Sequence, residues 1–236
     1  MPRTAQLNNV DHKHLRIDTR RVPGLGDDVM SAPTFPSEFR SVQAHYPIVF
    51  GKTAQGGFQP LALFGFQDGE NLFVDATGWD ADYVPLAVER QPFLVGVGGQ
   101  ELTVHVDLDS PRVVAAGGEA VFLEHGGTTP YLERINSVLL SLYQGLQEVP
   151  AFVAALLEHG LLESFTVDVQ LDDGSQHRLA GYYTIHEERL AALGADALAQ
   201  LHTQGHLQAA YMVVASASRF RALIARRNRR DAAAHA

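Results

Sequence analysis

The chain has 236 residues, of which 46% are hydrophobic and 19% charged, a composition typical of a folded protein and unlike that of a disordered one. The formal charge of −9 argues against broad nucleic-acid binding, which needs clustered lysine and arginine. Because the chain has no cysteine, disulfides, iron–sulfur clusters, thiolate zinc sites and a cysteine nucleophile are excluded.

The N-terminal segment is rich in turn-forming residues. Glycine, proline and aspartate break any helix or central strand over residues 22–28 and 32–36, so we expect residues 1–35 to be loosely ordered. The first 21 residues contain no apolar run of the kind found in secretory signals. No segment approaches the roughly 18 apolar residues of a membrane span. We therefore expect a cytoplasmic protein without a transmembrane segment, with signal-less export as the alternative.

Residues 38 to about 125 show mainly the alternation of strands. A short apolar run covers 46–50, and two hairpins are predicted, one at 61–74 around Asp68-Gly69 and one at 93–106 around Gly98-Gly99. A short helix is predicted between the hairpins, over residues 82–90. The first half of the chain is therefore expected to be an antiparallel, β-rich core.

The second half begins with a helix signal. Thr129 is a plausible N-cap, followed by Pro130 at the first helical position and Glu133 in the first turn. Pro150 is expected to end this helix and start a second one, which stops at Gly160.

Strand alternation then returns. Residues 165–171 and 177–184 predict a third hairpin with its turn at 172–174. Thr184 and Glu187 fit a capping box, in which Thr184 binds the Glu187 amide and starts a further helix. A long final helix from about residue 207 has an apolar face, which is a candidate seam for a homodimer. The predicted fold class is α+β, a single domain over residues 36–230 with a helical C-terminal layer.

Aromatic and charged residues are dense between residues 45 and 93, with the only tryptophan near the centre. Trp, Tyr and Arg are the residue types most often found at interaction hot spots. The candidate binding residues are His45, Tyr46, Asp75, Trp79, Asp80, Tyr83, Arg90 and Phe93. The alternative is structural: Trp79 and Phe93 would close one end of the β-core, and Arg90 would pair with an aspartate.

Several short motifs occur in order along the chain. They are HYPIVF (45–50), NLFVD (71–75), GWD (78–80) and GYYTIHEERL (181–190). Together these motifs resemble the SapC family of bacterial proteins, named for a surface-layer-associated locus, over residues 36–228. The resemblance implies a link to cell-surface processes and no particular activity.

With no serine in a recognisable nucleophile elbow, no catalytic residue is assigned. We expect an accessory protein that binds a protein or peptide partner and uses no cofactor. A structural surface-layer component is one alternative.

A metal-dependent enzyme is the other alternative. His105 and Asp107 would point to the same face of a strand, as two ligands of a 2-His-1-carboxylate iron site do. The third ligand would come from His125, His159 or His177. The alternation instead favours an exposed strand end, with Val104 and Val106 facing the core. The resemblance points to Asp107 and Ser110 and leaves His105 out.

A basic cluster ends the predicted final helix. Cations there complement the helix dipole, so a solvated helix end is expected, with contact to an acidic partner or anionic lipid as the alternative. The cluster consists of Arg219, Arg221, Arg226, Arg227, Arg229 and Arg230.

Overall fold

The computed structural model describes residues 3–98, 101–172 and 174–234, and the chain divides into two compact units. Unit 1 consists of Met1–Asp28, Val74–Asp80 and Leu86–Gln144, and unit 2 of Val29–Phe73, Ala81–Pro85 and Gly145–Ala236. Both combine antiparallel strands with helices, which confirms the α+β fold class. The chain passes repeatedly from one unit to the other, so neither unit is a separate stretch of sequence, and the single domain predicted over 36–230 stays a prediction.

Unit 1 is built mainly from short strands. Its elements are β1 (Thr4–Gln6), β2 (Arg16–Ile17), β6 (Val74–Asp75), β7 (Gly78–Trp79), α2 (Leu86–Glu89), β8 (Phe93–Gly98), β9 (Glu101–Asp107), β10 (Val113–Val114), β11 (Glu119–Ala120) and the first half of α3 (Pro130–Glu158). Two sheets have the strand orders β1-β9-β8 and β10-β2-β11, and β6 pairs with β7. The antiparallel β8–β9 pair confirms the hairpin predicted around Gly98-Gly99, although Gly99 lies outside the described residues.

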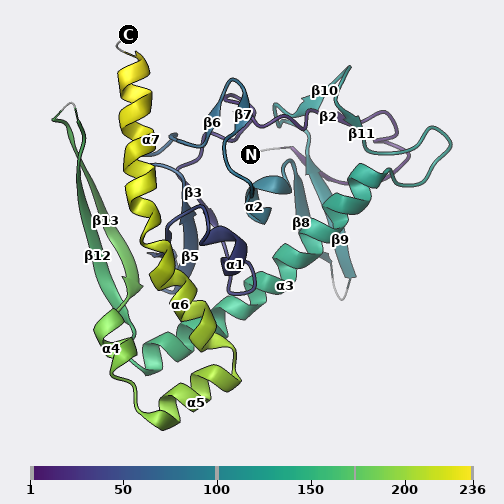
Figure 1. Cartoon of the computed structure of the whole chain (residues 1–236). Helices are drawn as coiled ribbons and strands as arrows, with labels where there is room; N and C mark the ends of the chain where they lie inside the picture. The colour runs from purple at the N-terminus through teal and green to yellow at the C-terminus, as the bar shows by residue number, and fades with distance from the viewer. Residues whose placement is uncertain (1–2, 99–100, 173, 235–236) are drawn as a thin grey trace. The chain divides into compact units, whose positions relative to one another are not determined.

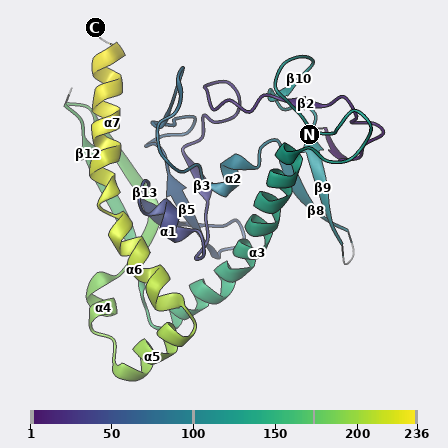
Figure 2. The same ribbon diagram turned by 45° about the vertical axis from the view of Figure 1, so that its right-hand side comes forward.

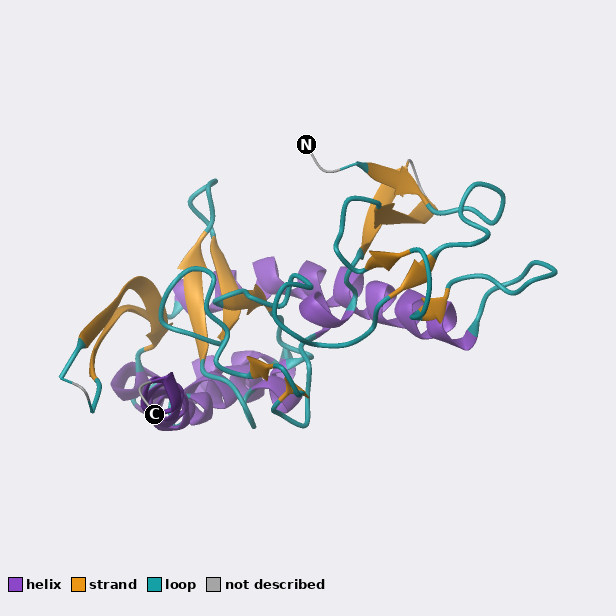
Figure 3. Cartoon of the chain, turned by 90° about the horizontal axis from the view of Figure 1, so that it is seen from above, coloured by secondary structure: helices purple, strands orange, loops and turns teal. Residues whose placement is uncertain are grey.

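The core of unit 1 lies between these strands and α3, as Figure 3 shows. Phe93 and Val106 are fully buried and pack with Leu132, Ile135 and Leu139 of the helix. The helix begins as predicted, because the Thr129 hydroxyl accepts a hydrogen bond from the Leu132 amide at 3.3 Å. The helix predicted at 82–90 is shorter: α2 starts only after Pro85, whose ring disfavours a helical residue before it.

Unit 2 contains a five-stranded antiparallel sheet with the order β12-β13-β4-β5-β3. Its elements are β3 (Ser31–Pro33), α1 (Phe39–Val42), β4 (Ile48–Lys52), β5 (Phe58–Leu63), the second half of α3, β12 (Leu162–Gln170), β13 (Gln176–Ile185), α4 (Glu187–Ala191), α5 (Ala195–Thr203), α6 (His206–Ser216) and α7 (Arg219–Ala234). The β12–β13 pair confirms the third predicted hairpin, whose turn includes Asp173 outside the described residues.

The first predicted hairpin is wrong. β5 pairs with β4 and β3, and Asp68-Gly69 lies in a loop that returns to form β6. The Glu70 carboxylate holds this loop by accepting a hydrogen bond from the Phe66 amide at 2.8 Å. This side-chain bond takes the place of the backbone hydrogen bonds that a hairpin would make. A Cβ on Gly65 would lie 2.5 Å from the Glu70 carbonyl oxygen, which is why this close approach needs glycine.

Two helices of unit 2, α3 and α4, differ from prediction. α3 continues through Pro150, because packing of the buried Val149 and Phe152 offsets the hydrogen bond that the exposed proline cannot make. His186, not Thr184, caps α4, since Thr184 is held extended opposite Glu163 in the β12–β13 ladder.

The predicted final helix is two helices, α6 and α7, separated at residues 217–218 (Figures 1 and 2). Its apolar face is used within unit 2, where α6 contacts α1, β4 and β13 and buries Ala209, Ala210 and Val213. A homodimer through this region remains a prediction.

The N-terminal segment, for which the sequence predicts loose order over residues 1–35, is described from residue 3 and contains short strands. It supplies β1, β2 and β3, and Ile17 and Asp27 are fully buried. The reason is a distant arginine: Arg112 donates to the carbonyl oxygens of Asp18 at 3.0 Å and Arg20 at 2.7 Å and to the Asp27 carboxylate at 2.5 Å. Turn-rich composition correctly excludes long strands here, but a buried guanidinium holds the loop in place.

Candidate functional site

Trp79 lies on a small hairpin in unit 1. β6 and β7 pair over two residues each, and the Asp75 carboxylate closes the turn by accepting the amides of Thr77 at 2.7 Å and Gly78 at 3.2 Å. The Trp79 side chain is partly exposed on this hairpin, and Asp80 beside it is exposed. The hairpin therefore presents an aromatic ring next to a carboxylate on a support that Asp75 stabilises.

Arg90 and Phe93, also in unit 1, serve the fold. The Arg90 guanidinium donates to the Phe93 carbonyl oxygen at 2.6 Å, and burial lowers the pKa of Arg90. Phe93 is fully buried in the core and lies 6.2 Å from the Tyr131 ring. The position of Phe93 therefore supports its structural interpretation. Because its side chain is buried, Phe93 can contribute to binding only by packing beneath residues at the surface.

The remaining candidates, His45, Tyr46 and Tyr83, belong to unit 2. Tyr46 is fully buried and its hydroxyl donates to the Tyr83 carbonyl oxygen. The Tyr83 hydroxyl donates to the buried Glu38 carboxylate at 2.9 Å, and the Thr34 hydroxyl donates to the same carboxylate at 2.7 Å. These bonds connect the segment Ala81–Pro85 to the body of unit 2. His45 is partly exposed beside Tyr46, with ring centroids 5.9 Å apart.

The predicted site thus contains two kinds of residue. Tyr46, Asp75, Tyr83, Arg90 and Phe93 each make contacts that hold their own unit together. His45, Trp79 and Asp80 are accessible enough to contact a partner.

The metal alternative has little support from the geometry. Val106 is buried and Val104 packs against the core, while His105 and Asp107 lie on the other face of β9. His105 Nε2 lies 3.1 Å from the Thr103 hydroxyl, and Asp107 accepts the Asp109 amide at 3.0 Å. Within residues 3–98, 101–172 and 174–234, no group of three or more His, Asp and Glu side chains could hold a metal ion.

The basic cluster is not simply a solvated helix end. The Arg226 guanidinium lies over the Phe73 ring at 4.2 Å, and Arg227 pairs with the buried Glu70 and with Asp231. Arg230 donates to the Asn71 carbonyl oxygen at 2.7 Å. These arginines of α7 fix the loop before β6, because the loop offers a buried carboxylate and an aromatic face.

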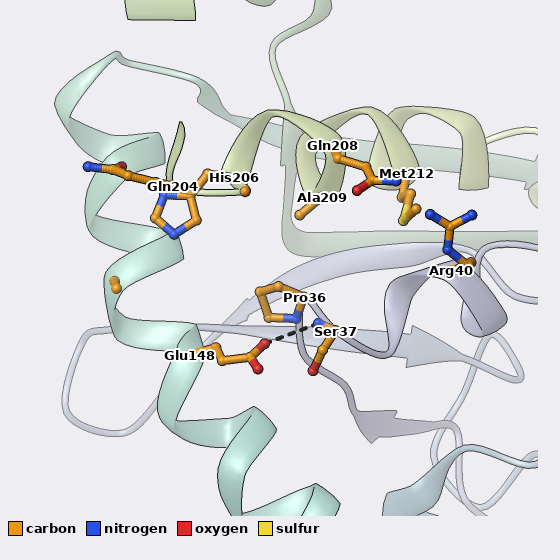
Figure 4. Close-up of a pocket in the computed structure, with 11 residues that line it drawn as sticks. Pro36, Ser37, Arg40, Glu148, Gln204, His206, Gln208, Ala209 and Met212 are labelled. Carbon is orange, nitrogen blue, oxygen red and sulfur yellow. Dashed lines mark hydrogen bonds between the residues drawn. The ribbon is translucent and has the colours of Figure 1, made fainter. Parts of the chain in front are cut away.

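A pocket of about 410 Å³ lies within unit 2, between α1, α3 and the start of α6 (Figure 4). Glu148 of α3 accepts the Ser37 amide at 3.1 Å at one side of it. Its lining combines charged, amide and apolar side chains, including Pro36, Arg40, Glu148, His206, Gln208 and Met212. This volume is in the range of small-molecule sites.

His206 lines the pocket, and Figure 4 shows its ring beside Gln204, to the upper left of Pro36. The ring packs edge-on against Phe152 at 5.6 Å, and burial lowers the pKa of the imidazole. Nδ1 is buried, and the described residues offer it no hydrogen-bond partner. His206 is therefore neutral at pH 7 in the folded protein.

Sequence reasoning missed this pocket. Its residues come from three segments, around residues 36–40, 148–151 and 204–212, and each segment alone is an ordinary turn or helix. The one local signal is Gly205, whose φ of 77° turns the chain between α5 and α6 and places His206 at the start of a helix.

The fold and these sites define the protein as a cysteine-free α+β protein with two β-containing units and a small-molecule-sized pocket in one of them. A sequence model of the SapC family matches residues 7–223, and the chain belongs to this family. The match starts well before residue 36, where the motif resemblance begins. No curated protein and no solved structure matches the chain. None of the helices in the described ranges combines the length and apolarity needed to cross a membrane.

Proposed function

We propose that this SapC-family protein is a non-catalytic accessory protein that binds a protein or peptide partner in bacterial cell-surface processes. The observation that carries the proposal is the partly exposed Trp79 beside the exposed Asp80 on the β6–β7 hairpin. A partner that covers an indole ring and pairs with a neighbouring carboxylate gains both apolar burial and a directional contact.

Two further observations support binding over catalysis. Polar candidates such as Asp75 and Arg90 are bound to backbone groups of their own unit, which suits a supporting role beneath a binding surface. The His105–Asp107 pair lies where the described residues supply no third metal ligand.

The test is co-purification from the bacterial host with Trp79→Ala and Asp80→Asn variants. We expect Trp79→Ala to lose the partner and Asp80→Asn to weaken its capture, because the indole supplies most of the buried area. Tyr211→Ala is the matched control, since Tyr211 is an aromatic residue of unit 2 with 50% of its surface exposed. A partner retained by Trp79→Ala would place the binding surface elsewhere.

Because Trp79 is the only tryptophan, its fluorescence reports directly on this surface. Adding the purified partner to the wild-type protein should shift the emission, and the Tyr211→Ala variant should show the same shift. Fractionation of the host cells tests the expected cytoplasmic location.

A further inference from the structure

The pocket of unit 2 carries a second proposal, independent of Trp79. We propose that it binds a small zwitterion, an amino acid or a dipeptide, with the ligand carboxylate at Arg40 and the ligand ammonium at Glu148. The pocket offers two opposite charges, an apolar surface between them and a volume of about 410 Å³.

Two oppositely charged side chains line the pocket, Arg40 and Glu148. Arg40 lies on the exposed side of α1, whose other face buries Phe39 and Val42. Its guanidinium makes no ion pair or side-chain hydrogen bond within the part of the chain that the structure describes. A guanidinium offers a planar set of donors that matches a carboxylate.

Glu148 supplies the negative charge from α3. Its Oε2 accepts the Ser37 amide at 3.1 Å, which fixes the carboxylate at the pocket wall. A carboxylate has about four acceptor positions, so this single bond leaves room for an ammonium. Figure 4 shows Glu148 and Arg40 at different sides of the pocket, and no ion pair joins them among the described residues.

His206 contributes no charge, because burial lowers its pKa. The proton of the neutral ring belongs on Nε2, since a proton on the buried Nδ1 would have no acceptor among the described residues. The pocket lining therefore carries separated charges that sum to zero. A singly charged ligand satisfies one of them and is repelled by the other, whereas a zwitterion satisfies both.

The surface between the charges is largely apolar. Pro36, Ala151, Ala209 and Met212 line it and suit an aliphatic side chain. The volume of about 410 Å³ accommodates an amino acid or a dipeptide. A longer peptide with distant ends would place only one terminus here, so the ligand must be short.

The experiment is a calorimetric titration with L-alanyl-L-leucine and with L-leucine. For the dipeptide, Arg40→Gln and Glu148→Gln should each reduce affinity by about tenfold, the value of one hydrogen bond to a charged group. The amide oxygen introduced by Glu148→Gln can still accept the Ser37 amide, so this variant keeps the pocket wall. Arg221→Gln on α7 and Glu158→Gln at the end of α3 are matched controls, exposed in unit 2 and away from the pocket, and should bind as the wild type does.

Modified ligands separate the two contacts. The C-terminally amidated dipeptide should bind equally well to the wild type and to Arg40→Gln, and the N-acetylated dipeptide equally well to the wild type and to Glu148→Gln. Equal losses for free and modified ligands would overturn the assignment of the two ends.

The location is tested by Ala151→Trp. Ala151 is exposed on α3 and lines the pocket, so a bulky side chain there blocks the space without entering the core. Binding should disappear while the thermal midpoint stays unchanged, and Trp79→Ala should bind the dipeptide normally. Unaltered binding in Ala151→Trp, or no binding by the wild type at millimolar ligand, would overturn the proposal.

Discussion

Each unit holds a buried carboxylate with arginine, Asp27 in unit 1 and Glu70 in unit 2, but the two arrangements differ in how deeply the arginine is buried. In unit 1 the Asp27 carboxylate is fully buried and Arg112 is 1% exposed, with Arg21 as a second partner at 3.1 Å. In unit 2 Glu70 is 5% exposed, whereas the side chain of Arg227 is 18% exposed. Removing an arginine leaves an anion away from water in both units, yet water can reach the second site more easily. Burial of the arginine side chain therefore distinguishes an ion pair of the core from one that holds a loop near the surface.

The largest predicted effect is in unit 1. Arg112→Met should lower the free energy of unfolding by about 3–5 kcal/mol, because it leaves the buried Asp27 with one arginine fewer. It also removes the donors to the Asp18 and Arg20 carbonyl oxygens. Urea unfolding followed by Trp79 fluorescence measures this effect in the unit that contains the pair.

The control is the double variant Asp27→Leu with Arg112→Met. Arg112 has a buried Nε without a hydrogen-bond partner in the described residues, so desolvation of the guanidinium is incompletely compensated. Replacing both charges should therefore be less damaging than replacing Arg112 alone. A double variant that is less stable than Arg112→Met would show that the Arg112–Asp27 pair itself, and not the loss of one arginine from the buried aspartate, sets the stability.

A smaller effect is expected in unit 2. Arg227→Met should destabilise by about 1–2 kcal/mol, because Glu70 keeps its bond from the Phe66 amide and is closer to solvent. Hydrogen exchange of residues 64–73, followed by mass spectrometry, should rise in this variant and remain unchanged in Arg229→Met, a neighbouring exposed arginine. A loss of stability as large as that of Arg112→Met would contradict the expectation that the effect grows with the burial of the arginine.

The same contrast explains what the sequence could predict. Local signals succeeded: Thr129 caps α3, and the alternating segments form the β8–β9 and β12–β13 hairpins. These features depend on residues of one helix start or of two strands that follow each other directly in the sequence. The motif resemblance also identified the family correctly.

Long-range contacts were beyond sequence reasoning. The order of the N-terminal segment depends on Arg112, which lies 85 positions from Asp27. Asp68-Gly69 gives a strong hairpin signal, but Glu70 and Arg227, 157 positions apart, hold the loop differently. Among the candidate binding residues, sequence could identify the aromatic types and offered burial of Phe93 as an alternative, but it did not predict that Tyr46 is buried.

The two units should also differ at the extremes of pH. Burial raises the pKa of Tyr131 in unit 1 to about 12 from an ordinary value of 10.0. A raised pKa favours the neutral phenol in the folded state, so its contribution is complete below pH 10 and is lost as the pH rises toward about 12. Tyr131→Phe should lose less stability over this interval than the wild type, measured by urea unfolding. Tyr211→Phe, at an exposed position, should follow the wild type.

On the acid side, the smallest effect is expected from His206 in unit 2. Its lowered pKa means that the unfolded chain binds a proton more readily than the folded one, so stability is complete above the ordinary value of 6.5 and falls as the pH drops below it. His206→Gln should remove this part of the acid sensitivity, seen as hydrogen exchange in α6 that changes less between about pH 7.5 and pH 5 than in the wild type. His202→Gln, in an exposed position near the end of α5, is the matched control. Equal acid sensitivity in His206→Gln and the wild type would mean that the buried Nδ1 accepts a proton without penalty, and that the pocket carries a positive charge at this end.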